Sequence, residues 1–172
     1  MFKQALIDGL IWSLLWIGFI FMILKWFPWE LLHDYPEDIQ KASKLPKPTP
    51  KQQKKSNIWS GIVSAIIFIS LLWFGLRTFA GIKVSFSTLF YYYLIIVMTW
   101  NVLDLLIMDW IIVCTITPDI VIIKGTKGCK GYKDYMFHFK GFLIGCFYSF
   151  LTAVIFSGIA YFILNYVMIK FY

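Results

Sequence analysis

Four long stretches of the chain consist almost wholly of apolar residues, and shorter polar segments separate them. The stretches cover about residues 6–27, 57–80, 85–114 and 141–169. About 20 apolar residues in a helix cross the ~30 Å hydrocarbon core of a bilayer, so each stretch is long enough for one crossing. Membrane β-strands need only ~10 residues and alternate in polarity, which these stretches do not. The pattern predicts an all-α integral membrane protein with four transmembrane helices.

Composition agrees with this prediction. The 172 residues are 60% hydrophobic and 20% aromatic, with a mean hydropathy of +0.74, whereas soluble proteins are roughly 45–50% apolar. The first stretch superficially resembles a secretory signal peptide, but no small-residue cleavage pattern follows it. We therefore expect a retained first helix, one membrane domain over residues 1–172, loops at 28–56 and 115–140, and no soluble domain.

Basic residues are distributed unevenly between the two sides of such a four-helix arrangement. Twelve of the 16 Lys and Arg residues lie in or beside the loops 28–56 and 115–140, and four lie on the other side. The positive-inside rule then places both loops in the cytoplasm and both termini outside, in what we expect to be a bacterial plasma membrane. This distribution accounts for the net charge of +7 without a nucleic acid partner.

The two loops carry different local signals. Asp34, with Glu37 three residues later, resembles a capping box and predicts a short surface helix. Residues 46–55 contain alternating prolines and lysines, which favour an extended tether. Residues 119–124 form a β-branched run followed by a Gly- and Lys-rich turn, which predicts a small hairpin on the bilayer surface. Lysines of these loops would attract anionic lipids by ~1 kcal/mol each, or serve only to set topology.

The third apolar stretch contains three polar residues, Asn101, Asp104 and Asp109, in the segment NVLDLLIMDW. Asp109 falls near the cytoplasmic headgroups, whereas Asp104 falls near the middle of the membrane with Asn101 on its face. In an α-helix Asp104 and Asp109 would be about 140° apart and would not form one site. A charge at that depth costs roughly 2.5–3.5 kcal/mol or more, and no Lys or Arg lies inside a predicted span, because Lys25 and Arg77 are at span ends. Asp104 is therefore protonated, hydrogen-bonded to Asn101 or Asn165, or bound to a proton, a cation or a cationic group.

Four further candidates, His33, Lys133, Asp134 and His138, lie on the predicted cytoplasmic side. Imidazoles and carboxylates could act as acid and base on a lipid headgroup, and the Lys-rich loops could hold its phosphate. Interfacial histidines without any chemistry are the alternative, because the spacing matches no known motif. We predict neither a metal site nor a cofactor.

A row of small residues follows the fourth stretch at every fourth position. Such a row lets another helix approach closely, because packing rather than hydrophobic force drives helix association in lipid. The expected partner is another helix of the same chain or a second copy in a homo-oligomer. The row consists of Gly141, Gly145, Ser149, Ala153 and Ser157.

No recognisable catalytic motif is present, so the expectation leans away from an enzyme. The sequence favours an accessory or assembly subunit of a larger membrane partner, or a small transporter-like protein with an acidic site at Asp104 and Asn101. The alternative is a membrane-embedded enzyme or binder that acts on anionic lipid headgroups at the cytoplasmic face. Convergence of His138 and Asp109 in one cleft would favour this alternative.

Overall fold

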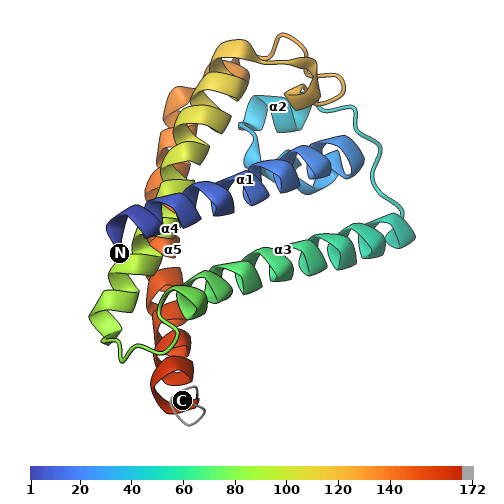
Figure 1. Ribbon diagram of the computed structural model, residues 1–172. Coiled ribbons are helices and arrows are strands. Elements are labelled where there is room, and N and C mark those ends of the chain that lie inside the picture. Colours follow the sequence, from blue (N-terminus) through green and yellow to red (C-terminus); the bar gives the residue numbers. More distant parts are fainter. Residues whose placement is uncertain (168–172) are drawn as a thin grey trace.

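The computed structural model describes residues 1–167, and every regular element in that range is helical (Figure 1). Four helices are long and apolar enough to cross a membrane, as the sequence predicts. The fourth apolar stretch ends with residues 168 and 169, which lie outside the described range. The four helices are α1 (Phe2–Trp26), α3 (Pro50–Thr78), α4 (Phe86–Leu103) with its continuation η3 (Asp104–Ile116), and α5 (Tyr135–Phe162) with its continuation η6 (Ile163–Val167).

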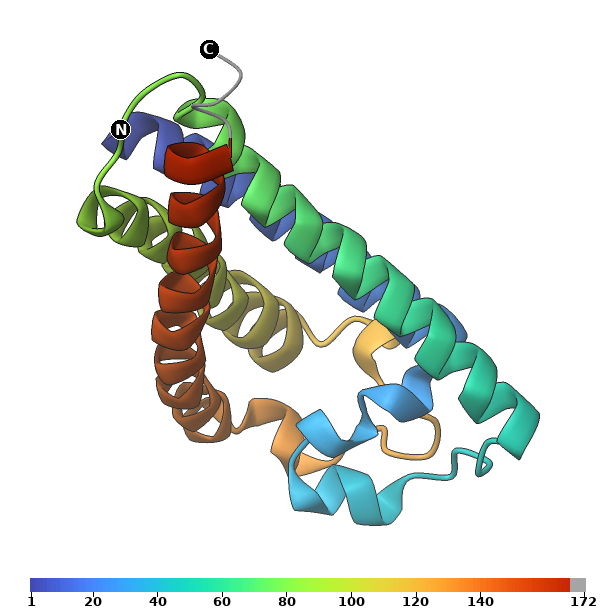
Figure 2. The same cartoon turned by 90° about the horizontal axis from the view of Figure 1, so that it is seen from below.

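Helix α4 is the centre of the bundle. It packs against α1 and against α5, while α3 packs mainly along α1 (Figures 1 and 2). Four of its side chains, Leu89, Tyr92, Tyr93 and Ile96, are fully buried, and Leu71 of α3 is fully buried in the same core. Three residues of the predicted small-residue row on α5, Ser149, Ala153 and Ser157, are buried. Their small side chains allow α4 and α5 to pack closely.

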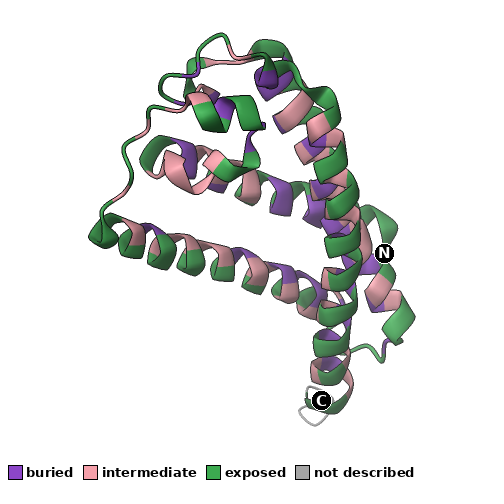
Figure 3. Ribbon diagram, turned by 180° about the vertical axis from the view of Figure 1, so that it is seen from behind, coloured by how far each residue is buried: buried purple, intermediate pink, exposed green. Residues whose placement is uncertain are grey.

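The outer faces of α3 and α5 remain exposed along their length (Figure 3). Large apolar side chains occupy these exposed positions. Together they form apolar patches larger than those that soluble monomers usually expose. On α3 they are Ile58, Ile62, Ile66, Ile69 and Trp73, and on α5 they include Leu143, Ile144, Phe147, Tyr148, Phe150, Leu151, Val154, Ile155, Ile159 and Phe162.

The two Lys-rich loops fold together into a cap over one end of the bundle. The cap contains η1 (Pro28–Glu30), η2 (Leu32–Asp34), α2 (Glu37–Ala42), η4 (Asp119–Val121) and η5 (Lys130–Lys133). A small core of its own includes Tyr35, Ile39, Val121, Ile123 and Tyr132. The Tyr35 hydroxyl donates to the Val121 carbonyl at 2.9 Å. Burial raises the pKa of the Tyr35 phenol, which therefore keeps the donated proton.

The prediction of a hairpin that includes residues 119–124 is wrong. Residues Asp119–Val121 form a 3-10 turn, and no strand occurs within residues 1–167. The backbone N–H of Ile123 donates to the Tyr132 hydroxyl at 2.8 Å, so a side chain takes the place of a strand partner. A buried phenol can thus satisfy a β-branched segment that would otherwise pair with another strand.

Two further expectations for the first loop are also wrong. Asp34 and Glu37 form no capping box, because α2 begins after Pro36 without a side-chain cap. The second half of the expected tether is helical, since α3 begins at Pro50. The capping box is formed instead by Thr49 and Gln52, and Pro50 occupies the first turn, where proline is well tolerated.

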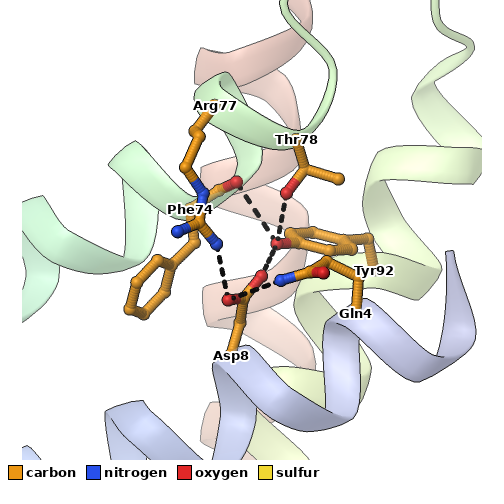
Figure 4. Close-up of polar contacts among 6 residues, drawn as sticks. All are labelled: Gln4, Asp8, Phe74, Arg77, Thr78 and Tyr92. Carbon is orange, nitrogen blue, oxygen red and sulfur yellow. Dashed lines mark hydrogen bonds and ion pairs between the residues drawn. The ribbon is translucent and has the colours of Figure 1, made fainter.

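A buried carboxylate joins α1, α3 and α4 at the end opposite the cap (Figure 4). Asp8 is fully buried, and its Oδ1 accepts from Gln4 at 3.0 Å and from Arg77 Nη2 at 2.7 Å. Its Oδ2 accepts from the Tyr92 hydroxyl, which also lies 3.0 Å from the Thr78 hydroxyl. Arg77, in the last turn of α3, thus neutralises Asp8.

Replacing Asp8 with Ala should destabilise the bundle. Arg77 would lose its acceptor, and Tyr92 would be left with the Phe74 carbonyl at 3.2 Å and the Thr78 hydroxyl at 3.0 Å. Breaking a fully buried pair costs about 3–5 kcal/mol. We expect a loss of roughly 2–3 kcal/mol, because the Arg77 side chain is 40% exposed and water can reach it. Thermal unfolding of the detergent-solubilised protein measures this effect. Tyr91→Phe, at an exposed position of α4, serves as the control. An unchanged unfolding temperature for Asp8→Ala would contradict the role of Asp8 in holding the three helices together.

Candidate functional site

A cavity of about 590 Å³ lies beneath the cap, bounded by α1, η2, η3 and α5. Apolar side chains such as Ile20, Leu24 and Met108 form much of its wall. The charged and amide side chains that line it are His33, Asp34, Asn101, Asp104, Asp109, His138 and Lys140. The structure thus gathers five of the sequence-predicted candidates in one place, together with Asp34 and Lys140.

The two acidic residues of the third span reach the same cavity because the helix changes its winding between them. Residues Asp104–Ile116 form a π-helix, in which hydrogen bonds connect residues five apart. The Thr117 N–H, for example, donates to the carbonyl of Ile112 at 2.8 Å. Residues five apart in a π-helix are about one turn apart, so Asp104 and Asp109 lie on nearly the same face. The expectation that these carboxylates are well separated around the helix is therefore wrong.

Asp109 forms a pair with His138 of α5. The two side chains meet at 2.9 Å between Nδ1 of the imidazole and Oδ1 of the carboxylate. His138 is 8% exposed, and within residues 1–167 its buried Nε2 has no hydrogen-bond partner. In a neutral imidazole, a carboxylate on Nδ1 selects the tautomer that carries its proton there and leaves a lone pair on Nε2. The convergence that would favour acid–base chemistry is thus present.

Asn101 is bonded to α5 rather than to Asp104. Its Nδ2 donates to the Phe142 carbonyl at 3.2 Å and lies 3.4 Å from the Cys146 sulfur. Gly145 makes this approach possible, because a Cβ at that position would overlap the Asn101 side chain. The other expected partner of Asp104, Asn165, donates instead to the Val84 carbonyl at 3.0 Å near the opposite end of the bundle.

Asp104 is the cavity carboxylate that lacks a partner. Asp109 pairs with His138, and Asp34 lies 3.2 Å from Nε2 of His33. Among the residues that the structure describes, Asp104 makes no side-chain hydrogen bond or ion pair, and Lys140 makes none either. Partial burial raises the pKa of the Asp34 carboxyl; His33 opposes this shift and Asp109 adds to it.

Two sequence-predicted candidates, Lys133 and Asp134, lie outside the cavity. Each satisfies backbone groups at a helix end. Lys133 donates to the Cys114 carbonyl at 2.6 Å and to the Thr117 hydroxyl at 2.7 Å, and so satisfies the C-terminal end of η3. Asp134 caps α5 by accepting the Phe137 N–H at 2.9 Å. Their contacts fix the two helices that carry Asp109 and His138.

Comparison with known proteins adds no assignment: no family model matches the chain, and no curated protein or solved structure matches it. Over residues 1–167, no group of three or more His, Cys, Asp and Glu side chains is arranged to hold a metal ion.

Two glycines of α5 give a matched test of the Asn101 contact. Gly145→Ala would push the Asn101 amide off the Phe142 carbonyl and destabilise the protein by about 1–3 kcal/mol, the cost of an unsatisfied buried polar group. Gly141→Ala meets no atom within 4 Å, and its better helix propensity should stabilise by up to ~1 kcal/mol. Thermal unfolding of both variants in the same detergent separates the effects. Equal stabilities would contradict the role of Gly145.

Proposed function

We propose that the four long helices cross a membrane, with the cap on the cytoplasmic side and both termini outside. Three observations support this proposal: the length and composition of the helices, the apolar exposed faces of α3 and α5, and the concentration of Lys residues at the cap. Lysines of the cap then lie near anionic headgroups, where each contributes about 1 kcal/mol of attraction.

Cysteine labelling tests this orientation. In a variant whose three native cysteines are replaced by Ser, Ile82→Cys introduces an exposed thiol in the α3–α4 loop, and Lys127→Cys introduces one in the cap. A membrane-impermeant maleimide should label Ile82→Cys on intact cells and Lys127→Cys only after permeabilisation. The reverse pattern would show that the orientation is inverted.

We further propose that the cavity binds a cationic group at Asp104. The observation that carries this proposal is the unpaired Asp104 carboxylate, which faces a partly apolar cavity at the depth of the spans. Ionisable residues inside membrane segments are costly and mark functional sites by default. A cation or a bound proton would neutralise Asp104, as Arg77 neutralises Asp8 at the other end of the bundle.

We infer from the apolar walls of the cavity that the cationic group is carried by an amphiphile. Its volume of about 590 Å³ falls in the usual range for small-molecule pockets, roughly 300–1,000 Å³. Gly141 and Ile144 line the cavity and are also exposed on α5, so the cavity opens towards the outer face of that helix. A molecule with a charged head and an apolar tail could enter there from the lipid.

Dodecyltrimethylammonium, whose charge is permanent, is a suitable probe for this site. We expect Asp104→Asn to weaken its binding about tenfold or more, since opposite charges ~5 Å apart attract by roughly 3 kcal/mol at an effective dielectric constant of ~20. Gly141→Leu should weaken binding by filling the cavity, because a side chain at that position meets open space. Titration of the purified protein, followed by intrinsic Trp fluorescence, measures the affinity.

Asp119→Asn removes the same charge from an exposed position of η4 and serves as the matched control. If Asp104→Asn bound the probe as tightly as Asp119→Asn and the unmodified protein, the cationic site would be ruled out.

A second candidate function is acid–base chemistry on a lipid headgroup at the cytoplasmic face. The hydrogen-bonded pair of His138 and Asp109 favours it, because a carboxylate that orients an imidazole is a recurrent arrangement for a general base. Lys140, on the same cavity wall, could attract the phosphate of an anionic lipid. The accessory-subunit hypothesis draws on no feature of the described residues beyond the exposed apolar faces.

A further inference from the structure

Two unpartnered groups of the cavity wall, a carboxylate and an imidazole nitrogen, can accept hydrogen bonds. The Asp104 carboxylate has no donor among the described residues, and Nε2 of His138 has none either. In the neutral imidazole with its proton on Nδ1 and directed at Asp109, Nε2 offers a lone pair. A buried acceptor without a donor costs about 1–3 kcal/mol, so a ligand that donated to the buried Nε2 of His138 would be favoured, and the partly buried Asp104 carboxylate could accept from the same ligand.

The contacts of α4 and its continuation η3 with α5 place these two acceptors in the same stretch of the helix contact. Asn101 bonds to Phe142 and lies against Cys146, while Asp109 bonds to His138. Because Asp104 lies between Asn101 and Asp109 along this continuous helix, it falls between these two contacts. The facing turn of α5 contains Gly141, which has no side chain and leaves open space there.

Charge selects among the possible donors. Three carboxylates line the cavity, Asp34, Asp104 and Asp109, whereas Lys140 is the one Lys or Arg side chain that lines it. A hydroxyl group would donate one hydrogen bond and leave the charge of Asp104 uncompensated. A quaternary ammonium would compensate the charge but has no N–H to donate. A primary ammonium does both, because it carries a positive charge and three donors.

We propose that the ligand of this cavity is a primary amine carried on an apolar tail, and that its ammonium group donates to Asp104 and to Nε2 of His138. The proposal rests on the cationic site at Asp104 and specifies its chemistry. Asp104 supplies the charge, His138 supplies the discrimination between amine types, and Asp109 holds the His138 tautomer. The apolar walls formed by residues such as Leu105 and Met108 accommodate the tail.

Three probes with the same tail separate these contributions in the unmodified protein. Dodecylamine has charge and donors at neutral pH, dodecyltrimethylammonium has charge alone, and dodecanol has a donor alone. We expect dodecylamine to bind about tenfold more tightly than dodecyltrimethylammonium, the value of one hydrogen bond to a buried acceptor, and dodecanol to bind most weakly. Trp fluorescence titration in a nonionic detergent gives all three affinities.

Two substitutions at His138 identify the atom responsible. In His138→Asn the amide nitrogen occupies the position of Nδ1, so the bond to Asp109 is kept and the acceptor at Nε2 is lost. In His138→Gln the amide reaches the position of Nε2 and the bond to Asp109 is lost. The preference for dodecylamine should disappear in His138→Asn and persist in part in His138→Gln. His33→Asn, at an exposed imidazole, should keep the full preference.

The outcomes distinguish this inference from the proposed function. If the unmodified protein bound both cationic probes with affinities within twofold, and Asp104→Asn weakened both, the cationic site would stand and the amine inference would fall. If neither probe bound in an Asp104-dependent way, both would fall. A preference for dodecylamine that survived in His138→Asn would also overturn the inference, because Nε2 would not be its cause.

Discussion

The structure depends on one constraint: a polar group among apolar helices must find its partner within the protein. A polar side chain that the helices bury loses its hydrogen bonds to water, and leaving such a group unsatisfied costs several kcal/mol. Asp8 meets this constraint by drawing Arg77 of α3 and Tyr92 of α4 to α1. Asn101 meets the same constraint by donating a hydrogen bond to the carbonyl of Phe142. Hydrophobic packing alone lets apolar helices slide along one another, whereas these directional bonds fix one register for each pair.

Much of the fold follows from the sequence, because the length of an apolar run is a strong signal. The four runs predict the four long helices, and the loops that separate them are rich in lysine. What the loops do is decided by contacts between distant residues. Tyr35 bonds to Val121 and Tyr132 bonds to Ile123, so two loops that look independent in the sequence form one core. Neither local propensity nor charge contains that information.

The site was only partly predictable for a different reason. Polar residues in the third run attract attention because their surroundings are apolar, and Asp104, Asp109 and His138 can all be named in this way. Their spatial arrangement cannot be predicted in this way, because it depends on the π-helical winding of Asp104–Ile116. Such winding leaves no mark in an apolar pattern. Asp8 and Arg77 were missed because each looks like the polar flank of its run; only the crossing of α1 and α3 makes them a pair.

The opening beside Gly141 means that the concentration of a ligand in the membrane, rather than in water, determines how far the cavity is filled. An opening on the outer face of α5 leads into the bilayer, if the helices span it as proposed. A tailed amine partitions strongly into such a phase, so its concentration at the opening greatly exceeds its concentration in water. Occupancy is then governed by the mole fraction of the ligand in the membrane. A site with modest intrinsic affinity would be well filled, and its selectivity would be measured against the surrounding lipids rather than against dissolved solutes.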